Sequence, residues 1–351
     1  MRLAPTGKSG ATNRRRHYCT NAPYAGTFVL MAVVHGALPK VLIPYPGPTE
    51  DPRQQDIFVY FRPETNGVRV ESAVLKVIEH CPAYKHDMNL VYLANVPGEY
   101  ITEQHIVEHY YALKLDFAVY GKDRFTPHMK EAFTQTFRIP FVEADIVGSF
   151  EALRRLGLGP EELFALWVPE DDLAVINGQS VKRVGQSYIV NYDIPALLHK
   201  NSRGTDIAVM IFRVGLGYSF FNDLVEQIRD SLIQNGVTNP KTPPSRAFHY
   251  SKGPFEQILD GFGYLLTPEL QSASLADLTF STFLTRNGVD FDIIRGVIQH
   301  PILHFKEETG KIVEENLFSY TLFDDYETAL HKLNTMVAQV VLPRRSSSRR
   351  W

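Results

Sequence analysis

Residues 56–114 alternate two hydrophobic patterns, and this alternation constrains the fold more than any other feature of the chain. Apolar runs at 57–61 and 90–93 are short and rich in branched and aromatic residues, as is typical of buried strands. The segment 68–80 between them places apolar residues at helical spacing, and a second helical segment follows at 102–114. Strands that alternate with amphipathic helices predict a sheet covered by helices rather than a helical bundle.

The alternation continues as far as residue 238. The predicted strands are 117–120, 141–147, 173–176, 187–192 and 207–214, and the predicted helices are 127–137, 150–156 and 220–233. Gly178 and Gly185 favour a hairpin between 173–176 and 187–192. We therefore expect an α+β protein whose antiparallel sheet of four or five strands carries helices on one or both faces.

A proline-rich break at 239–244 separates this region from a unit of different character. The segment 245–343 predicts a smaller, mainly helical carboxyl-terminal unit. Its expected elements are helices at 274–285, 291–300 and 324–340 and a hairpin of 302–305 with 312–315. The last residues, 344–351, form a basic tail.

Residues 1–55 are expected to be an amino-terminal extension that ends in a stiff proline-rich connector at 45–53. An apolar run at 27–34 follows a basic cluster, but it is short for a secretory signal and lacks a small-residue cleavage site. Met31 offers a second possible start of translation. No apolar stretch reaches the ~20 residues that a membrane span needs, so the sequence predicts no membrane association.

Composition narrows the classes of partner. The 351-residue chain is 44% hydrophobic and has a net charge of -3, which gives no general attraction to nucleic acid, so a nucleic-acid partner is not expected. Its 2 cysteines are too few for a disulfide framework and favour a reducing, cytoplasmic location. His300 and His304 have ligand-like spacing, but Pro301 between them breaks a helix, and no metal site is predicted.

Several basic side chains are candidates for binding phosphate. Arg62 directly follows the strand at 57–61, and Pro63 stops that strand, so the guanidinium lies where the chain turns. Tyr110 and Lys114 are about one helical turn apart and are expected to share a face. Either a phosphate site or a surface arginine and a core tyrosine would account for these residues.

Two later segments add further candidates. Arg154 and Arg155 end the helix at 150–156, where they either contact phosphate or solvate the helix end. The segment 199–206 contains His199, Arg203, Thr205 and Asp206, and it is either part of a site or a polar turn between strands.

The order of these motifs resembles the nucleoside diphosphate kinase family over residues 56–238. The resemblance implies a ferredoxin-like antiparallel sheet with covering helices, a nucleoside di- or triphosphate bound with Mg²⁺, and phosphoryl transfer through a histidine. It also implies phosphate contacts from Arg62 and from Arg154 or Arg155, and it places Tyr110, Lys114, Arg203, Thr205 and Asp206 at the nucleotide site, where the family's tyrosine helps to position the catalytic histidine.

The histidine of the family's Asn-x-x-His-Gly-Ser-Asp signature is replaced here by Arg203. A guanidinium stays protonated and has no lone pair with which to attack phosphorus. The expected function is therefore nucleotide binding without phosphohistidine chemistry. Two alternatives remain open: a non-catalytic scaffold or regulatory protein, or an active kinase that uses His199 from a displaced position. A homo-oligomer is also possible.

Overall fold

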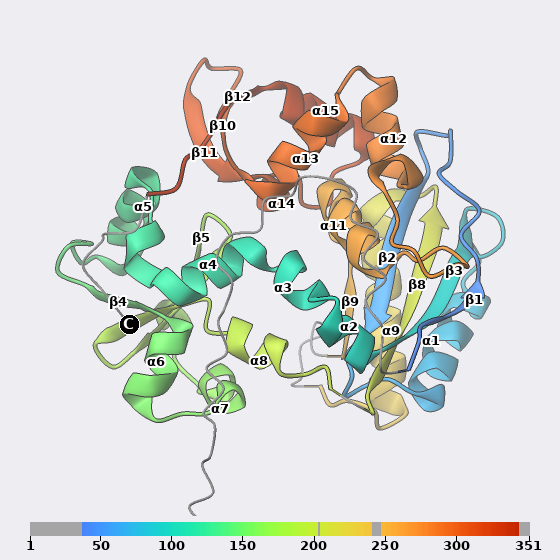
Figure 1. Cartoon of the computed structure of the whole chain (residues 1–351), viewed down its shortest axis with the longest axis horizontal. Coiled ribbons are helices and arrows are strands. Elements are labelled where there is room, and N and C mark those ends of the chain that lie inside the picture. The colour runs from blue at the N-terminus through green and yellow to red at the C-terminus, as the bar shows by residue number, and fades with distance from the viewer. Residues whose placement is uncertain (1–36, 203, 241–246, 344–351) are drawn as a thin grey trace, which may run out of the picture. The chain divides into compact units, whose positions relative to one another are not determined.

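The computed structural model describes residues 37–202, 204–240 and 247–343. Expectations for residues 1–36, for Arg203 and for the basic tail 344–351 lie outside the described residues. The central element is a five-stranded sheet in the order β1-β3-β8-β2-β9 (Figure 1). Its strands are β1 (Lys40–Ile43), β2 (Gln55–Phe61), β3 (Met88–Pro97), β8 (Asp206–Val214) and β9 (Phe248–Tyr250).

The topology of this sheet confirms the predicted α+β class. Strand β8 pairs antiparallel with both β2 and β3, and β9 pairs antiparallel with the other edge of β2. Helix α1 (Val68–His80) connects β2 to β3, and α9 (Gly217–Gln234) follows β8. The order β9-β2-β8-β3 with these two helical connections is the ferredoxin-like arrangement. Strand β1 extends it by pairing with β3.

The pleat of β2 divides the core between the two faces of the sheet. Ile57, Val59 and Phe61 pack with α1 and α9, whereas Phe58 and Tyr60 pack with carboxyl-terminal helices on the other face (Figure 1). Because both faces are covered, every residue of β2 is buried. This explains why residues 57–61 of β2 are an unbroken apolar run rather than an alternating one.

A long insertion separates β3 from β8. Its elements are α2 (Gly98–Glu103), α3 (Ile106–Tyr110), α4 (Ala112–Tyr120), η1 (Gly121–Arg124), α5 (Pro127–Phe137), β4 (Asp145–Gly148), α6 (Ser149–Leu156), α7 (Pro160–Ala165), η2 (Glu170–Asp172), β5 (Leu173–Ile176), β6 (Gln179–Val184), β7 (Ser187–Val190) and α8 (Ile194–Leu198). Its four strands form a second sheet, β4-β7-β6-β5. The predicted hairpin of 173–176 with 187–192 was wrong. Strand β5 pairs instead with β6, and β6 pairs in turn with β7.

The strand predicted at 117–120 is the end of helix α4. Phe117 and Ala118 are buried, so the apolar run marks a packed helix rather than a strand. The helix passes very close to β4: a Cβ atom added at Gly148 would lie 2.1 Å from the carbonyl oxygen of Ala118. Short apolar runs fit both structures, and here tertiary packing selected the helix.

The carboxyl-terminal region contains α11 (Pro254–Tyr264), η3 (Leu275–Asp277), α12 (Thr279–Arg286), α13 (Phe291–Gln299), β10 (Ile302–Lys306), β11 (Ile312–Asn316), α14 (Leu317–Tyr320), α15 (Tyr326–Asn334) and β12 (Met336–Gln339). The predicted hairpin is present as β10 and β11. The last predicted helix was too long, because residues 336–339 leave α15 and pair with β10 as an edge strand.

The regions on the two sides of the break at 239–244 share one sheet and one core. Strand β9 comes after the break and pairs with β2. Phe255, Phe280 and Tyr326 pack in the same cluster as Phe58.

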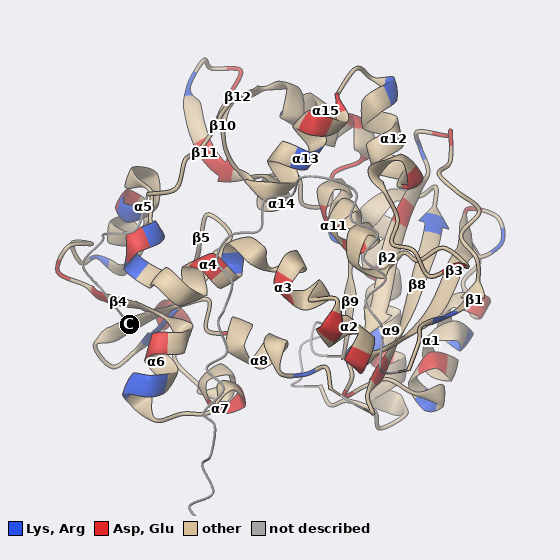
Figure 2. Ribbon diagram, viewed as in Figure 1, with Lys and Arg blue, Asp and Glu red and all other residues tan. Residues whose placement is uncertain are grey.

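Basic and acidic residues occur on most elements, with neither sign confined to one group of helices or strands (Figure 2). Among the described residues, no helix has the length and apolar character required to cross a membrane.

Candidate functional site

A small cavity of about 20 Å³ lies where β2 ends, between the central sheet and the insertion. Its polar lining comes from three separate segments: Arg62 after β2, Tyr111 between α3 and α4, and Lys200 with Asn201 after α8. Leu197, Ile207 and the ring of Tyr264 are among the apolar parts of the wall. A space of this size holds about one or two water-sized groups.

Arg62 is fixed by the end of the strand and by aromatic neighbours. Its backbone N–H donates to the carbonyl of Ala247 over 3.2 Å, which continues the pairing of β2 with the chain around β9. Its guanidinium carbon lies 5.9 Å from the ring centre of Tyr60, and its side chain hydrogen-bonds to the Tyr111 hydroxyl. Burial by itself would lower the pKa of Arg62, but Tyr111, Tyr60 and Tyr264 raise it above its ordinary value, so the charge is retained.

Tyr111 is a neutral donor on the cavity wall. Burial raises the pKa of its hydroxyl, although the charge of Arg62 acts in the opposite direction. Since a guanidinium only donates, the Tyr111 oxygen accepts from Arg62 and keeps its own proton for donation.

Lys200 brings a second positive charge to the cavity. Its Nζ atom lies 2.6 Å from Oε1 of Glu64, and the Lys200 side chain is only 9% exposed whereas that of Glu64 is 49% exposed. Partial burial works against the charged form of Glu64, but the hydrogen bonds from Lys200 and from the Glu64 backbone, together with the charges of Lys200 and Arg62, outweigh it and lower the pKa of the carboxyl group.

Asn201 leaves one polar atom of the cavity wall unsatisfied. Its Oδ1 atom is buried and has no hydrogen-bond partner among the described residues. An unpartnered buried oxygen costs free energy, and the amide can rotate to present either acceptor or donor. The cavity therefore combines two cations, the Tyr111 hydroxyl and the unpartnered amide oxygen of Asn201.

Behind the cavity lies a buried polar cluster around His249 of β9. The His249 ring stacks on Tyr60 with 4.5 Å between ring centres, and its Nε2 lies 3.3 Å from Oδ2 of Asp260. Ser251 donates to the same carboxylate oxygen over 2.8 Å. Tyr110 joins this cluster by donating to Glu256 over 2.9 Å. Through the His249 ring, this cluster packs against Tyr60, which in turn lies next to the Arg62 guanidinium.

The structure separates two residues that were expected to share one helix face. Helix α3 ends at Tyr110 and α4 begins at Ala112, so Tyr110 and Lys114 do not lie on one continuous helix. Tyr110 points into the His249 cluster, and the Lys114 ammonium faces Asp193 at 3.9 Å. Neither lines the cavity, whereas Tyr111, the residue between the two helices, does.

Arg154 and Arg155 lie on α6 of the insertion, and neither lines the cavity. Arg155 is engaged locally, because it donates to Asp145 at 3.0 Å and to Glu151 at 2.6 Å. This position at the last turn of the helix agrees with the interpretation that these arginines solvate the helix end.

The segment that resembles the kinase signature forms a hydrogen-bonded turn. Thr205 donates through its hydroxyl to the carbonyl of Ser202 over 2.8 Å. Asp206 accepts from Asn66 at 2.9 Å and from Asn95 at 2.8 Å, which ties the start of β8 to its neighbours. His199 is exposed at the end of α8 and does not line the cavity.

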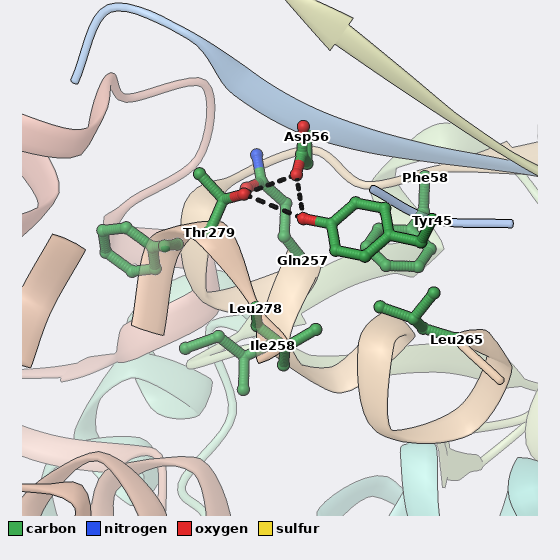
Figure 3. A pocket seen from close by; sticks show the side chains of 9 residues that line it. Tyr45, Asp56, Phe58, Gln257, Ile258, Leu265, Leu278 and Thr279 are labelled. Carbon is green, nitrogen blue, oxygen red and sulfur yellow. Dashed lines mark hydrogen bonds between the residues drawn. The ribbon is translucent and has the colours of Figure 1, made fainter. Parts of the chain in front are cut away.

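A second cavity, of about 10 Å³, lies beside Asp56 near the start of β2 (Figure 3). The Tyr45 and Thr279 hydroxyls each contact Asp56 Oδ2 at 2.5 Å. Arg213 completes the pair with Asp56 at 2.8 Å. The polar groups of this second cavity are already bonded to one another, and the cavity holds about one water molecule. We therefore assign it a role in holding these segments together rather than in binding a ligand.

Sequence reasoning missed Lys200, Asn201, Tyr111 and the role of Glu64. Lys200 and Asn201 lie inside the segment that drew attention for His199, and Glu64 closes the Arg62-Pro63-Glu64 motif. The chemistry of these residues was visible in the sequence, but the pairing of Glu64 with Lys200, 136 positions apart, depends on the tertiary fold. No family model, no curated protein and no solved structure matches this chain.

Proposed function

We propose that the protein binds the terminal phosphate of a nucleoside di- or triphosphate at the cavity lined by Arg62 and Lys200. The observation that carries this proposal is the convergence of two largely buried cations on one small cavity, Arg62 from the end of β2 and Lys200 from the end of the long insertion. Charged hydrogen bonds to phosphate oxygens are among the strongest that proteins make. Tyr111 and Asn201 supply further polar contacts at the same place.

The size of the cavity decides which part of the nucleotide it takes. A space of about 20 Å³ accommodates oxygens of one phosphate group but not a nucleobase. The nucleoside therefore lies outside it, and selectivity among bases is expected to be weak.

We expect Mg²⁺ to bind only together with the nucleotide. The described residues contain no group of three or more histidine, cysteine, aspartate or glutamate side chains that could hold a metal ion. Mg²⁺ commonly keeps several waters and binds through substrate phosphates. Phosphate oxygens and water would therefore provide most of its ligands here.

We propose binding without phosphoryl transfer through a histidine. His199 is the residue next to Lys200, yet it is exposed and does not line the cavity. A histidine nucleophile must reach the phosphorus atom directly.

The proposal is tested by calorimetric titration of ADP and ATP, with and without Mg²⁺, against the wild type and the Lys200→Met and Arg62→Ala variants. A charged contact contributes about 1.5 to 3 kcal/mol, so each change should weaken binding by about tenfold or more. Lys76→Met removes an exposed lysine of α1 and serves as the matched control. Thermal melting checks that Arg62→Ala, which also loses packing on Tyr60, remains folded. Absence of heat with every nucleotide would reject the proposal.

A further inference from the structure

Tyr110 and Tyr111 are adjacent in the chain, but their side chains point to different places. Tyr110 donates through its hydroxyl to Glu256 of α11 over 2.9 Å, and it lies outside the cavity. Tyr111 lines the cavity and accepts a hydrogen bond from Arg62. The two tyrosine rings meet edge to face, with 4.7 Å between their centres. A movement of the Tyr110 ring therefore displaces the phenol of the cavity.

The backbone at Tyr111 is not part of a regular helix. Helix α3 ends at Tyr110 and α4 begins at Ala112, so Tyr111 belongs to neither. Its φ of -97° and ψ of 22° lie in the sparsely populated region between helical and extended backbone. Because no helix continues through this residue, the side chains packed against its ring help to set the direction of the hydroxyl.

Five side chains form a closed ring of contacts that includes the cavity. The Arg62 guanidinium carbon lies 5.9 Å from the ring centre of Tyr60, and Tyr60 stacks on His249 at 4.5 Å. His249 meets the Tyr110 ring at 5.8 Å and an angle of 88°. Tyr110 then contacts Tyr111, which is hydrogen-bonded to Arg62. Because the ring is closed, the position of Tyr110 fixes that of Tyr111 relative to Arg62.

We infer that Tyr110 is a positioning residue of the phosphate site: its bond to Glu256 holds the ring against which Tyr111 presents its hydroxyl to the ligand. This inference rests on the proposed function and names a residue that supports binding without touching the phosphate. A ligand-binding group must be held to within about 0.5 Å of its productive position, and neighbouring hydrogen bonds supply that constraint. Helix α11, which follows the proline-rich break, thereby becomes part of the support of the cavity.

The Tyr110 hydroxyl can be removed without dismantling its surroundings. Tyr110→Phe keeps the ring and its contact with His249. Glu256 stays in place, because its other oxygen accepts from the backbone N–H of Lys252 over 2.5 Å. The change therefore releases only the bond that fixes the tilt of the ring.

The test is calorimetric titration of ADP with Mg²⁺ against the wild type, Tyr110→Phe, Tyr111→Phe and the double variant. Tyr111→Phe should weaken binding by about tenfold, as expected for a lost hydrogen bond to a charged group. Tyr110→Phe should weaken it about three- to tenfold, since the Tyr111 hydroxyl remains but is less well placed. Added to Tyr111→Phe, it should weaken binding by less than about twofold, because no hydroxyl is left to position.

Tyr250→Phe is the matched control. The Tyr250 hydroxyl donates to Asn222 over 3.0 Å, a bond of similar length, but the residue packs on the face of the sheet covered by α1 and α9 and does not line the cavity. This variant should change ADP affinity by less than about twofold. Thermal melting compares the stability of both variants, so that equal losses of ADP binding in Tyr110→Phe and Tyr250→Phe would assign the effect to general destabilisation and overturn the inference.

Fluorine NMR of protein labelled with fluorotyrosine follows Tyr111 directly and needs no ligand. The Tyr111 signal, identified by its absence from Tyr111→Phe, should shift or broaden in Tyr110→Phe. An unchanged signal shows that Tyr110 does not position Tyr111.

The titrations separate this inference from the function on which it rests. If Arg62→Ala and Lys200→Met weaken ADP binding but Tyr110→Phe does not, or if its effect is the same in the Tyr111→Phe background, the positioning role is wrong and the proposed function stands. If the wild type binds neither ADP nor inorganic phosphate, both fail.

Discussion

Asp56 of β2 and Arg213 of β8 are opposite each other in the antiparallel ladder and form a two-pronged ion pair. Arg213 Nε donates to Oδ1 over 2.8 Å, and its second terminal nitrogen donates to Oδ2 over 2.9 Å. Tyr45 and Thr279 bind the same carboxylate, so the pair joins β2 to the segment after β1 and to α12. One pair of residues thus links β2 and β8 to the segment after β1 and to α12.

Removing Arg213 should destabilise the protein strongly. Arg213→Met leaves the Asp56 side chain, which is 5% exposed, without its counter-charge. Loss of one partner of a buried pair costs about 3 to 5 kcal/mol in the free energy of unfolding. Urea unfolding measures this difference. Arg53→Met breaks the exposed surface pair with Asp51 and is expected to leave the free energy of unfolding almost unchanged. Similar losses in both variants would contradict the structural role of the buried pair.

Incubation with labelled ATP should produce no acid-labile, base-stable phosphate on the protein. Only a neutral imidazole can accept and release a phosphoryl group readily near pH 7, and His199 is exposed outside the cavity. The measurement compares the wild type with His199→Ala after equal exposure to ATP and Mg²⁺. Strong labelling that disappears in His199→Ala would show that this histidine reaches the nucleotide and that the protein is an active phosphotransferase.

Gly148→Ala should disturb the contact between α4 and β4. The new Cβ would lie 2.1 Å from the Ala118 carbonyl oxygen, a backbone atom that can move away only by shifting the helix. Such overpacking costs about 1 to 3 kcal/mol or more in the free energy of unfolding.

The matched control is Gly159→Ala. This glycine has a φ of -75°, and its nearest neighbour is the flexible Glu162 carboxylate at 3.3 Å, so the change should stay within about 1 kcal/mol. Chemical denaturation of both variants checks the difference, and an equal effect would count against close packing at Gly148.

Alkaline pH should destabilise the protein partly through Tyr92. Burial raises the pKa of its hydroxyl to about 12 from the ordinary value of 10.0. Between these values the unfolded chain loses the proton while the folded chain keeps it, so stability falls as pH rises from about 10 to 12, by roughly 3 kcal/mol in all.

Tyr92→Phe should remove this part of the pH dependence. It also removes the hydrogen bonds of the hydroxyl with Tyr264 and Leu266, both 3.1 Å, so the variant starts less stable at neutral pH. Free energies of unfolding measured at several pH values between 9 and 12 give the slope of stability against pH for the wild type and for the variant. Tyr84→Phe, at a half-buried tyrosine, is the control. Parallel slopes for wild type and Tyr92→Phe would show that Tyr92 does not titrate as expected.

The sequence by itself determined the elements whose pattern is local. Helix α1 runs over 68–80 as its apolar spacing predicts, and β2 and β8 follow from unbroken apolar runs that only a doubly covered sheet can bury. The α+β class follows from the same alternation. Arg62 was identifiable as a candidate because the end of a strand is set by Pro63, one residue away.

Only the tertiary structure decided which residues, distant in sequence, contact one another. Tyr111 faces the cavity in place of Tyr110 because the chain leaves the helix for one residue, and no spacing rule predicts where such a break falls. The apolar run at 117–120 became a helix against Gly148, and residues 336–339 became a strand beside β10, since each found a partner far away in sequence. Lys200 reaches Glu64 across 136 residues for the same reason: local pattern fixes which face of an element is apolar, but packing in three dimensions fixes its neighbours.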